Sequence, residues 1–323
     1  MNWENKNVLV TGATGFIGSH LVKRLVTEGA QVSALIIPEC SLGPIADFSD
    51  HINIIQADIA NLDSLQAALV LENPDIAFHL AACVDVRRDW DCVSMMIKNN
   101  LVGTSNLLHV LKDHQIDLMI NIGSSEEYGN ASVPQSEANR ELPVSPYSFS
   151  KVAAVYLCQM AARAFSFPVV TARLFPVYGP GQNTGMFIPS AIMKLLAHEE
   201  FRMSPGEQIR EFNYVDDVVE ALIRLSACDA ADIIGSVVNI GNGVPYKIIG
   251  VIDTIRSLIE DTACIQVGAL PYRVGEVMES YCDTRLLRRL TSWSPQFSLA
   301  NGLQFTVQWY RNELSAGEGK SNV

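Results

Sequence analysis

The feature that most limits the possible folds is a glycine-rich turn between a short apolar segment and a helix. Residues 7–10 are apolar and largely β-branched, which predicts a buried strand, and residues 19–28 predict a helix. Gly12, Gly15 and Gly18 stand between them. Glycines there permit a tight turn, a close approach of the backbone to a pyrophosphate, and packing of the helix on the strand. The pattern predicts a dinucleotide-binding turn; the alternative is a glycine-rich turn without a ligand.

The alternation of strands and helices continues along the first half of the chain. Further apolar strands are expected at 31–37, 52–58, 75–80, 118–122 and 169–174. Helical segments separate these strands, and this order predicts an α/β fold with a doubly wound, Rossmann-like parallel sheet.

Glycine and proline interrupt the regular pattern after residue 174. We therefore expect a dinucleotide-binding domain over 1–174 and a smaller, mainly substrate-binding C-terminal lobe over 175–314. Within that lobe, residues from about 213 to 245 are expected to return to the first domain. The polar residues 315–323 are expected to form a disordered tail.

Composition excludes several classes of protein. The 323 residues carry a formal net charge of −12, which argues against a nucleic-acid partner or an anionic membrane surface. An anionic substrate would therefore need locally placed arginines. The seven cysteines contain no C-x-x-C pair, so neither a disulfide framework nor a metal site is expected. No apolar run approaches the roughly 18 residues of a membrane span, which predicts a cytoplasmic protein.

A hydroxyl-rich loop and a Tyr-x-x-x-Lys step predict the active site. Ser145 and Pro146 are suited to begin a helix, on which Tyr147 and Lys151 share a face. The charge of Lys151 is expected to lower the pKa of the Tyr147 phenol and make it a usable proton donor or acceptor. Ser124 follows a buried strand, at the sheet edge where α/β proteins bind ligands, and is suited to hold the substrate oxygen.

The sequence leaves the choice of cofactor open. The strand over 31–37 ends in Ile36 and Ile37, which offer neither the acid that holds the ribose of NAD nor an arginine for the 2′-phosphate of NADP. NAD is favoured because no cation stands where that phosphate would lie, and NADP remains possible. Asp58 either meets the adenine or caps the following helix.

Together these residues resemble the extended short-chain dehydrogenase/reductase family, in particular its nucleotide-sugar epimerases, dehydratases and reductases. The resemblance covers nearly the whole chain. It rests on the glycine turn over 11–18, His79-Leu80-Ala81-Ala82, Asn100-x-x-Gly103-Thr104, Ser124 with Tyr147 and Lys151, Tyr178-Gly179-Pro180-Gly181, Arg210-x-Phe212-x-Tyr214-Val215-Asp216-Asp217 and Arg273-x-x-Glu276.

The resemblance implies a role for each matching residue. Tyr147 would exchange a proton with the C4 oxygen of the sugar of a nucleotide-diphosphate sugar while hydride passes between C4 and the nicotinamide. Ser124 would orient that oxygen, and Arg210 and Arg273, with Ser125, would bind the substrate. The cofactor would be held by Gly12, Thr14, Gly15, Phe16, Ile17, Gly18, Asp58, Ile59, Leu80, Ala81, Ala82, Asn100, Tyr147, Lys151 and Val177.

The resemblance also implies a homodimer, packed through helices at about 93–114 and 147–165.

Two positions depart from the family pattern. Pro176 stands where many relatives have an asparagine that contacts the substrate, and Val84 stands where many have a serine near the sugar. Contacts to the sugar are therefore expected to differ from those of the best-known members.

The resemblance implies several reactions without separating them. Ser124-Ser125-Glu126 is similar to the corresponding step of GDP-mannose 4,6-dehydratases, in which the glutamate takes the C5 proton and is catalytic. The fuller run over 123–129 is similar to GDP-4-keto-6-deoxy-mannose reductases, in which the glutamates are structural. We place a 4-keto-sugar reductase slightly ahead of a 4,6-dehydratase or a 4-epimerase with tightly bound NAD. The alternative from another class is a non-catalytic NAD(P)-binding regulator.

Overall fold

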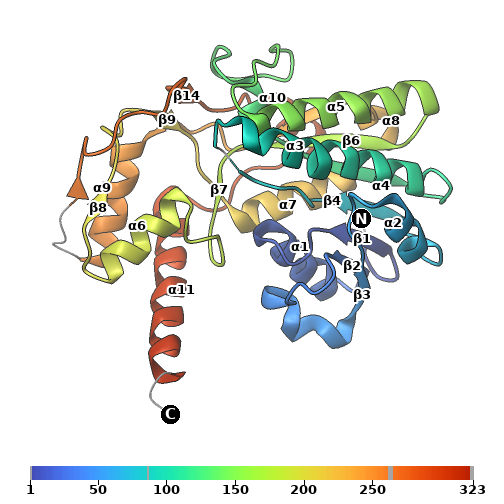
Figure 1. The fold of residues 1–323 in the computed structure, drawn as a ribbon, viewed down its shortest axis with the longest axis horizontal. Coiled ribbons are helices and arrows are strands. Elements are labelled where there is room, and N and C mark those ends of the chain that lie inside the picture. Colours follow the sequence, from blue (N-terminus) through green and yellow to red (C-terminus); the bar gives the residue numbers. More distant parts are fainter. Residues whose placement is uncertain (1, 86, 261–264, 321–323) are drawn as a thin grey trace.

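The computed structural model describes residues 2–85, 87–260 and 265–320. Its centre is a parallel sheet of seven strands within that part of the chain, in the order β11-β6-β5-β4-β1-β2-β3 (Figure 1). The predicted doubly wound, Rossmann-like sheet is confirmed. The strands are β1 (Asn7–Thr11), β2 (Gln31–Ile36), β3 (Ile52–Gln56), β4 (Ile76–His79), β5 (Leu118–Ser124), β6 (Val169–Leu174) and β11 (Val237–Ile240).

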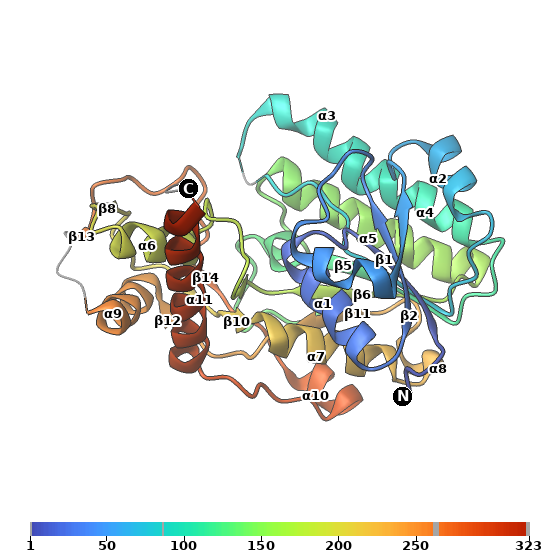
Figure 2. The same ribbon diagram turned by 90° about the horizontal axis from the view of Figure 1, so that it is seen from below.

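Helices cover both faces of the sheet and bury an apolar core on each (Figure 2). One face packs against α2 (Leu62–Leu69), α4 (Gly103–Leu111) and α5 (Pro146–Phe165). The other packs against α1 (Phe16–Thr27) and α7 (Val215–Ser226). Because both faces are covered, the strands are apolar along nearly their whole length, which is typical of parallel sheets.

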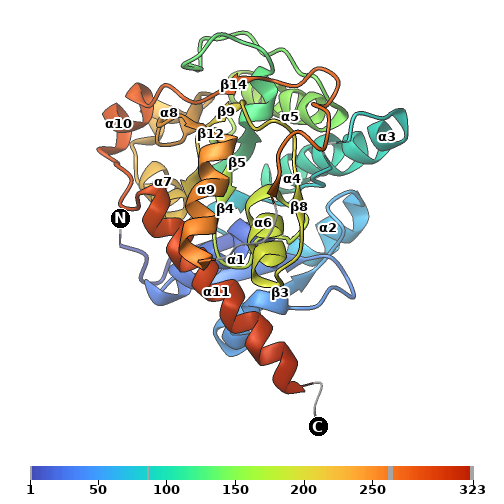
Figure 3. The same cartoon turned by 90° about the vertical axis from the view of Figure 1, so that its left-hand side faces the viewer.

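A second, smaller lobe lies beside the carboxyl ends of the strands. Its apolar core lies between α6 (Phe187–Leu196), α9 (Ile248–Ile259) and α11 (Leu299–Lys320) (Figure 3). Short strands complete it: β7 (Val177–Tyr178), β8 (Phe201–Arg202), β9 (Ile209–Arg210), β10 (Asn213–Tyr214), β12 (Tyr246–Lys247), β13 (Ile265–Gln266) and β14 (Glu279–Ser280).

The remaining helices are short. They are η1 (Gly43–His51), η2 (Trp90–Cys92), α3 (Val93–Met96), the π-helix η3 (Ile97–Val102), η4 (Ser125–Tyr128), α8 (Ala230–Ile233) and α10 (Arg285–Thr291). The chain re-enters the sheet lobe at α7 and β11 before it completes the second lobe.

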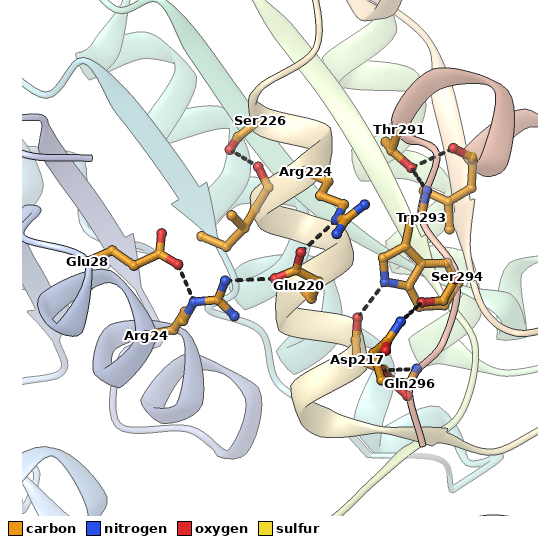
Figure 4. A network of polar contacts seen from close by, with 12 residues as sticks. Arg24, Glu28, Asp217, Glu220, Arg224, Ser226, Thr291, Trp293, Ser294 and Gln296 are labelled. Carbon is orange, nitrogen blue, oxygen red and sulfur yellow. Dashed lines mark hydrogen bonds and ion pairs between the residues drawn. The ribbon is translucent and has the colours of Figure 1, made fainter. Parts of the chain in front are cut away.

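Polar contacts of α7 tie the C-terminal part of the chain to the sheet lobe (Figure 4). The Asp217 carboxylate accepts the backbone N–H groups of Gln296, at 2.8 Å, and Phe297, at 3.1 Å. The Trp293 indole donates to the Asp217 carbonyl at 3.1 Å. Arg24 of α1 pairs with Glu220 at 2.7 Å. Asp217, which belongs to one of the family motifs, therefore has a structural role here.

The tail differs from the prediction. The sequence predicts disorder over 315–323, whereas the backbone of α11 continues as a helix to Lys320. Extending a helix that packing has already nucleated fixes one residue per added hydrogen bond, so a polar extension costs little. The structure therefore gives helical backbone over 315–320, and 321–323 lie outside the described residues.

Three further features concern the described residues alone. None of their helices is long and apolar enough to cross a bilayer. They contain no group of three or more His, Cys, Asp or Glu side chains arranged to hold a metal ion. Six of the seven cysteines are described, and all six are free thiols; Cys264 lies outside the described residues.

Candidate active site

The glycine turn between β1 and α1 is shaped for a phosphate group. Gly12 has a φ of +67°, and a Cβ there would lie 2.7 Å from the backbone nitrogen of Ala81. A Cβ at Gly18 would lie 2.1 Å from the Gly12 carbonyl oxygen, so both positions require glycine. Helix α1 begins after Gly15 with no side-chain cap and no acid in its first turn. Its first N–H groups and its dipole therefore fit a pyrophosphate.

A buried histidine fixes the end of β4 beside this turn. His79 bonds the hydroxyl of Thr11 at 2.8 Å and that of Thr104 at 2.9 Å. Burial, together with the charge of Lys151, lowers the pKa of His79 to about 3, so the imidazole is neutral. The Thr11 hydroxyl also accepts the backbone N–H of Ala81 at 3.1 Å. These bonds fix the backbone at the small residues expected to face the cofactor.

Asn100 holds the loop after β4. It lies in the π-helix η3, and such helices are frequent at functional sites. Its amide accepts the N–H of Cys83 at 2.7 Å and donates to the Cys83 carbonyl at 3.0 Å and to the Ser150 hydroxyl at 2.9 Å. Asn100 thus orders the loop and joins it to α5. A direct contact of Asn100 with the cofactor stays a prediction.

The remaining expected cofactor residues lie at strand ends of the sheet lobe or just beyond them. Asp58 and the buried Ile59 follow β3, and the Asp58 carboxylate accepts the backbone N–H of Ala60 at 2.9 Å. Asp58 does not cap α2, because Asn61 accepts the Ser64 N–H at 3.1 Å and is the N-cap. A contact of Asp58 with adenine stays a prediction. Val177 lies in β7, which follows β6, and its contact with the cofactor also stays a prediction.

Ser124, Tyr147 and Lys151 come together at the carboxyl ends of the strands. Ser145 caps α5 by accepting the Ser148 N–H at 3.0 Å, as the sequence predicts. The Tyr147 phenol is buried and hydrogen-bonded to the Ser124 side chain. Lys151 is also buried, and its Nζ donates to the Ile122 carbonyl at 2.6 Å.

The electrostatics of Tyr147 differ from the prediction. Burial raises the pKa of the phenol, and the nearby carboxylates of Glu127 and Glu126 raise it further. The hydrogen bond with Ser124 lowers the pKa without outweighing burial, because desolvation disfavours the phenolate, and the lowering expected from Lys151 is not found. Burial also lowers the pKa of Lys151 to about 8, against the opposing attraction of Glu127.

This shift of Lys151 predicts a pH dependence. An amine whose pKa is about 8 loses its charge as the pH rises through that value. If the ammonium helps to hold the cofactor, kcat/KM for NAD(H), which reports the free enzyme, should fall above pH of about 8. Replacing the exposed Lys112 with Met should leave the profile unchanged. A wild-type profile that stays flat to about pH 10, near the ordinary lysine pKa, would contradict the assignment.

The two adjacent glutamates of η4 have different environments. Glu127 is fully buried, accepts the backbone N–H of Ser124 at 2.6 Å, and pairs with Arg173 at 2.6 Å. Glu126 is exposed, and its charge acts on both Tyr147 and Arg210. Glu127 therefore supports the Ser124 backbone, whereas the Glu126 carboxylate, whose charge acts on the phenol, has no partner among the described residues. Ser125, between Ser124 and Glu126, is buried.

Sequence reasoning missed Arg173. It is fully buried in β6, pairs with Glu127 and also with Glu141 at 2.9 Å, and lies 4.4 Å above the ring of Tyr128. The available signal was an arginine inside an otherwise apolar strand, because charged residues are rarely fully buried unless they are paired.

The side chain of Arg210 contacts the turn that carries Arg273, the other motif arginine of the second lobe. Arg210 Nη2 pairs with Glu276 Oε1 at 3.1 Å and also donates to the Val277 carbonyl. The turn is closed by the Glu276 N–H, which donates to the Arg273 carbonyl at 3.0 Å. The Arg273 side chain is exposed. Binding of the substrate diphosphate by these arginines stays a prediction.

A comparison with known protein families agrees with this geometry. The model of the NAD dependent epimerase/dehydratase family matches residues 8–241, from β1 to just beyond β11. The chain belongs to this family. The predicted resemblance to nucleotide-sugar epimerases, dehydratases and reductases is thereby confirmed, as is the prediction of an enzyme. The preference for NAD is confirmed at the level of the family.

Individual relatives carry out different reactions. The chain is 30% identical over 322 residues to the trifunctional UDP-glucose 4,6-dehydratase/UDP-4-keto-6-deoxy-D-glucose 3,5-epimerase/UDP-4-keto-L-rhamnose-reductase RHM2 of Arabidopsis thaliana. That match covers 95% of this chain and 47% of the relative, so the chain spans about half the length of that enzyme. The chain is also 30% identical to the UDP-glucose 4-epimerase of Mycolicibacterium smegmatis, over 94% of this chain and 98% of the relative.

A solved structure shows the same fold. The UDP-glucuronic acid 4-epimerase of Bacillus cereus, in complex with UDP-glucuronic acid and NAD, superposes with a TM-score of 0.85. The two are 29% identical, and the match covers 95% of this chain and 99% of that chain. Because relatives of each kind are similar to this chain, the comparisons do not separate a reductase from a dehydratase or an epimerase.

Proposed function

We propose that this enzyme reduces the C4 ketone of a UDP-sugar, with hydride from NADH and a proton from Tyr147. The observation that carries the proposal is the environment of the phenol. Tyr147 is buried and hydrogen-bonded to Ser124, and burial disfavours its ionised form. A phenol held as an acid suits the reaction direction that consumes a proton. The choice of UDP follows the substrates named for the relatives.

Each residue of the site has a task in this reaction. When bound, the reduced nicotinamide would supply the hydride. Tyr147 would give its proton to the C4 oxygen, Ser124 would hold that oxygen beside the phenol, and Lys151 would bond the nicotinamide ribose. The turn that contains Gly12, Gly15 and Gly18 would hold the pyrophosphate of the cofactor.

A second candidate is a 4,6-dehydratase, and one observation favours it. Glu126 is exposed beside Tyr147, whereas Glu127 is buried in its ion pair with Arg173. A carboxylate in that place is suited to take the C5 proton while water leaves from C6. On this alternative Tyr147 would first accept the C4 hydroxyl proton, and the cofactor would be regenerated within each turnover.

The state of the cofactor tests the proposal. The purified protein is denatured, and any released nicotinamide is identified. Fresh enzyme then receives NADH with UDP-4-keto-6-deoxy-glucose, or UDP-glucose without added cofactor. A reductase should consume one NADH per keto sugar and leave UDP-glucose unchanged. Conversion of UDP-glucose with tightly held NAD and no net change in NADH would reject the reductase in favour of the dehydratase or epimerase.

Replacing Glu126 with Gln separates the two candidates further. In a reductase the change should alter kcat by less than about threefold, because no C5 proton is moved. In a dehydratase it should lower kcat by about 10²- to 10⁴-fold, the usual contribution of a general base. Product formation is measured by chromatography. The exposed Glu313 on α11, changed to Gln, is the matched control and should have no effect.

A homodimer and a cytoplasmic location remain proposals. Exposed apolar side chains support the dimer, because Phe149, Tyr156 and Met160 recur at intervals that place them along one side of α5. This helix is one of the two expected to form the interface.

A further inference from the structure

We infer that Arg88 is a third arginine of the diphosphate site, contributed by the sheet lobe and acting with Arg210 and Arg273. The inference rests on the proposed nucleotide-sugar substrate. Arg88 lies in the loop that follows β4, between Cys83 and η2. None of the family motifs in this sequence contains it.

The first observation is an unpaired buried donor. Nη1 of Arg88 is shielded from solvent and has no hydrogen-bond partner among the described residues. Buried polar groups in native proteins are almost always paired, and the cost of leaving a charged group unpaired is high. An anionic ligand that accepts from Nη1 would remove that cost.

The neighbouring arginine provides a contrast. Arg87 is exposed, and its guanidinium is bonded to Asp85, with Nε at 2.8 Å and Nη2 at 2.6 Å from Oδ2. The Asp85 carboxylate is therefore already used by Arg87, and Asp89, the other carboxylate of this loop, accepts the backbone N–H of Asp91 at 2.7 Å. Arg88 is left with its charge available to a ligand.

The second observation is the position of Arg88 between the lobes. A Cβ built on Gly275 would lie 2.9 Å from Arg88 Nη1 and 3.9 Å from its Cζ. The guanidinium thus packs against the turn that carries Arg273 and Glu276. Because Glu276 pairs with Arg210, Arg88 stands beside the residues that the family resemblance assigns to the diphosphate.

The third observation is the local charge. The chain has a net charge of −12, yet the guanidinium of Arg88 packs against the turn that carries Arg273, and Arg210 pairs with Glu276 of the same turn. Arginine forks bind phosphate oxygens in bidentate geometry, and a diphosphate offers several such oxygens. A sugar carboxylate, as in a uronic acid, is the other source of an anionic oxygen at this place. The contact with the 273–276 turn favours the diphosphate.

Binding of UDP tests the assignment without any turnover. The protein is saturated with NAD, and UDP is titrated calorimetrically into the wild type, Arg88→Gln and Arg87→Gln. Arg88→Gln should weaken UDP binding about 10- to 100-fold, as expected for the loss of a charged hydrogen bond. Arg87→Gln, the matched control, should change it less than about twofold. Arg88→Lys keeps the positive charge but loses the bidentate geometry of the guanidinium, so its UDP affinity should lie between those of the wild type and Arg88→Gln.

The outcomes separate the two sources of the anion. Equal UDP affinity in the wild type and Arg88→Gln would overturn the inference. If Arg88→Gln weakened the binding of UDP-glucuronate alone, and not that of UDP or UDP-glucose, Arg88 would bind the sugar carboxylate. The diphosphate assignment would then be wrong. Thermal unfolding of each variant establishes that it is folded, and Arg88→Lys keeps the test valid should Arg88→Gln unfold. Because UDP binding is measured without catalysis, failure of the proposed reduction would not affect this result.

Discussion

Replacing Tyr147 with Phe should lower turnover by about 10²- to 10⁴-fold and leave cofactor binding intact. The substitution removes the hydroxyl, which is hydrogen-bonded to Ser124, and keeps the ring that packs in the core. Proton transfer by a positioned side chain contributes a factor of this size. Turnover is followed on each candidate UDP-sugar, and NAD(H) affinity is measured by fluorescence titration.

Tyr156 on the same helix is the control for this variant. Its hydroxyl bonds Glu141 at 3.1 Å, and its side chain is exposed. Tyr156→Phe should therefore retain nearly full activity. If Tyr147→Phe were as active as Tyr156→Phe on a substrate that the wild type converts, Tyr147 would not be the proton donor. Loss of NAD(H) affinity together with turnover would instead indicate a role in holding the cofactor.

Local patterns account for what the sequence predicted well. The strand, the turn through Gly12, Gly15 and Gly18, and the helix after it lie within one short segment, so periodicity and backbone geometry decide their structure. The start of α5 at Ser145 and Pro146 was predictable for the same reason. The order of the family motifs then predicted that Ser124 lies near Tyr147 and Lys151.

Properties that depend on distant partners were not predictable. The lysine four residues from Tyr147 suggested a lowered phenol pKa, but burial and the carboxylates of η4 determine its direction. The sequence around Arg173 predicts only a strand. Its ion-pair partners Glu127 and Glu141 are distant in the sequence and become its neighbours only in the folded protein. Spacing along the chain gives contacts within one element, and burial is a property of the whole packed structure.

The buried ion pair should be the most sensitive point for stability. Replacing Arg173 with Met leaves Glu127 buried without its cation, and breaking such a pair typically costs about 3–5 kcal/mol. The free energy of unfolding is measured in urea, with the same saturating NAD for every variant. Arg285, which pairs with Asp283 on the surface, is the matched control, and Arg285→Met should have no measurable effect. Equal stability of the two variants would show that the buried pair does not stabilise the fold.

A double variant separates stability from catalysis. Replacing Glu127 with Val in the Arg173→Met background removes the stranded charge, so much of the lost stability should return. Turnover should not return with it. Without the Glu127 carboxylate, the N–H of Ser124 loses its acceptor at 2.6 Å, and the hydroxyl that bonds Tyr147 is no longer held in place. Full activity in the double variant would mean that the pair serves folding alone, whereas restored stability with low kcat and an unchanged KM for NADH would assign Glu127 the positioning of Ser124.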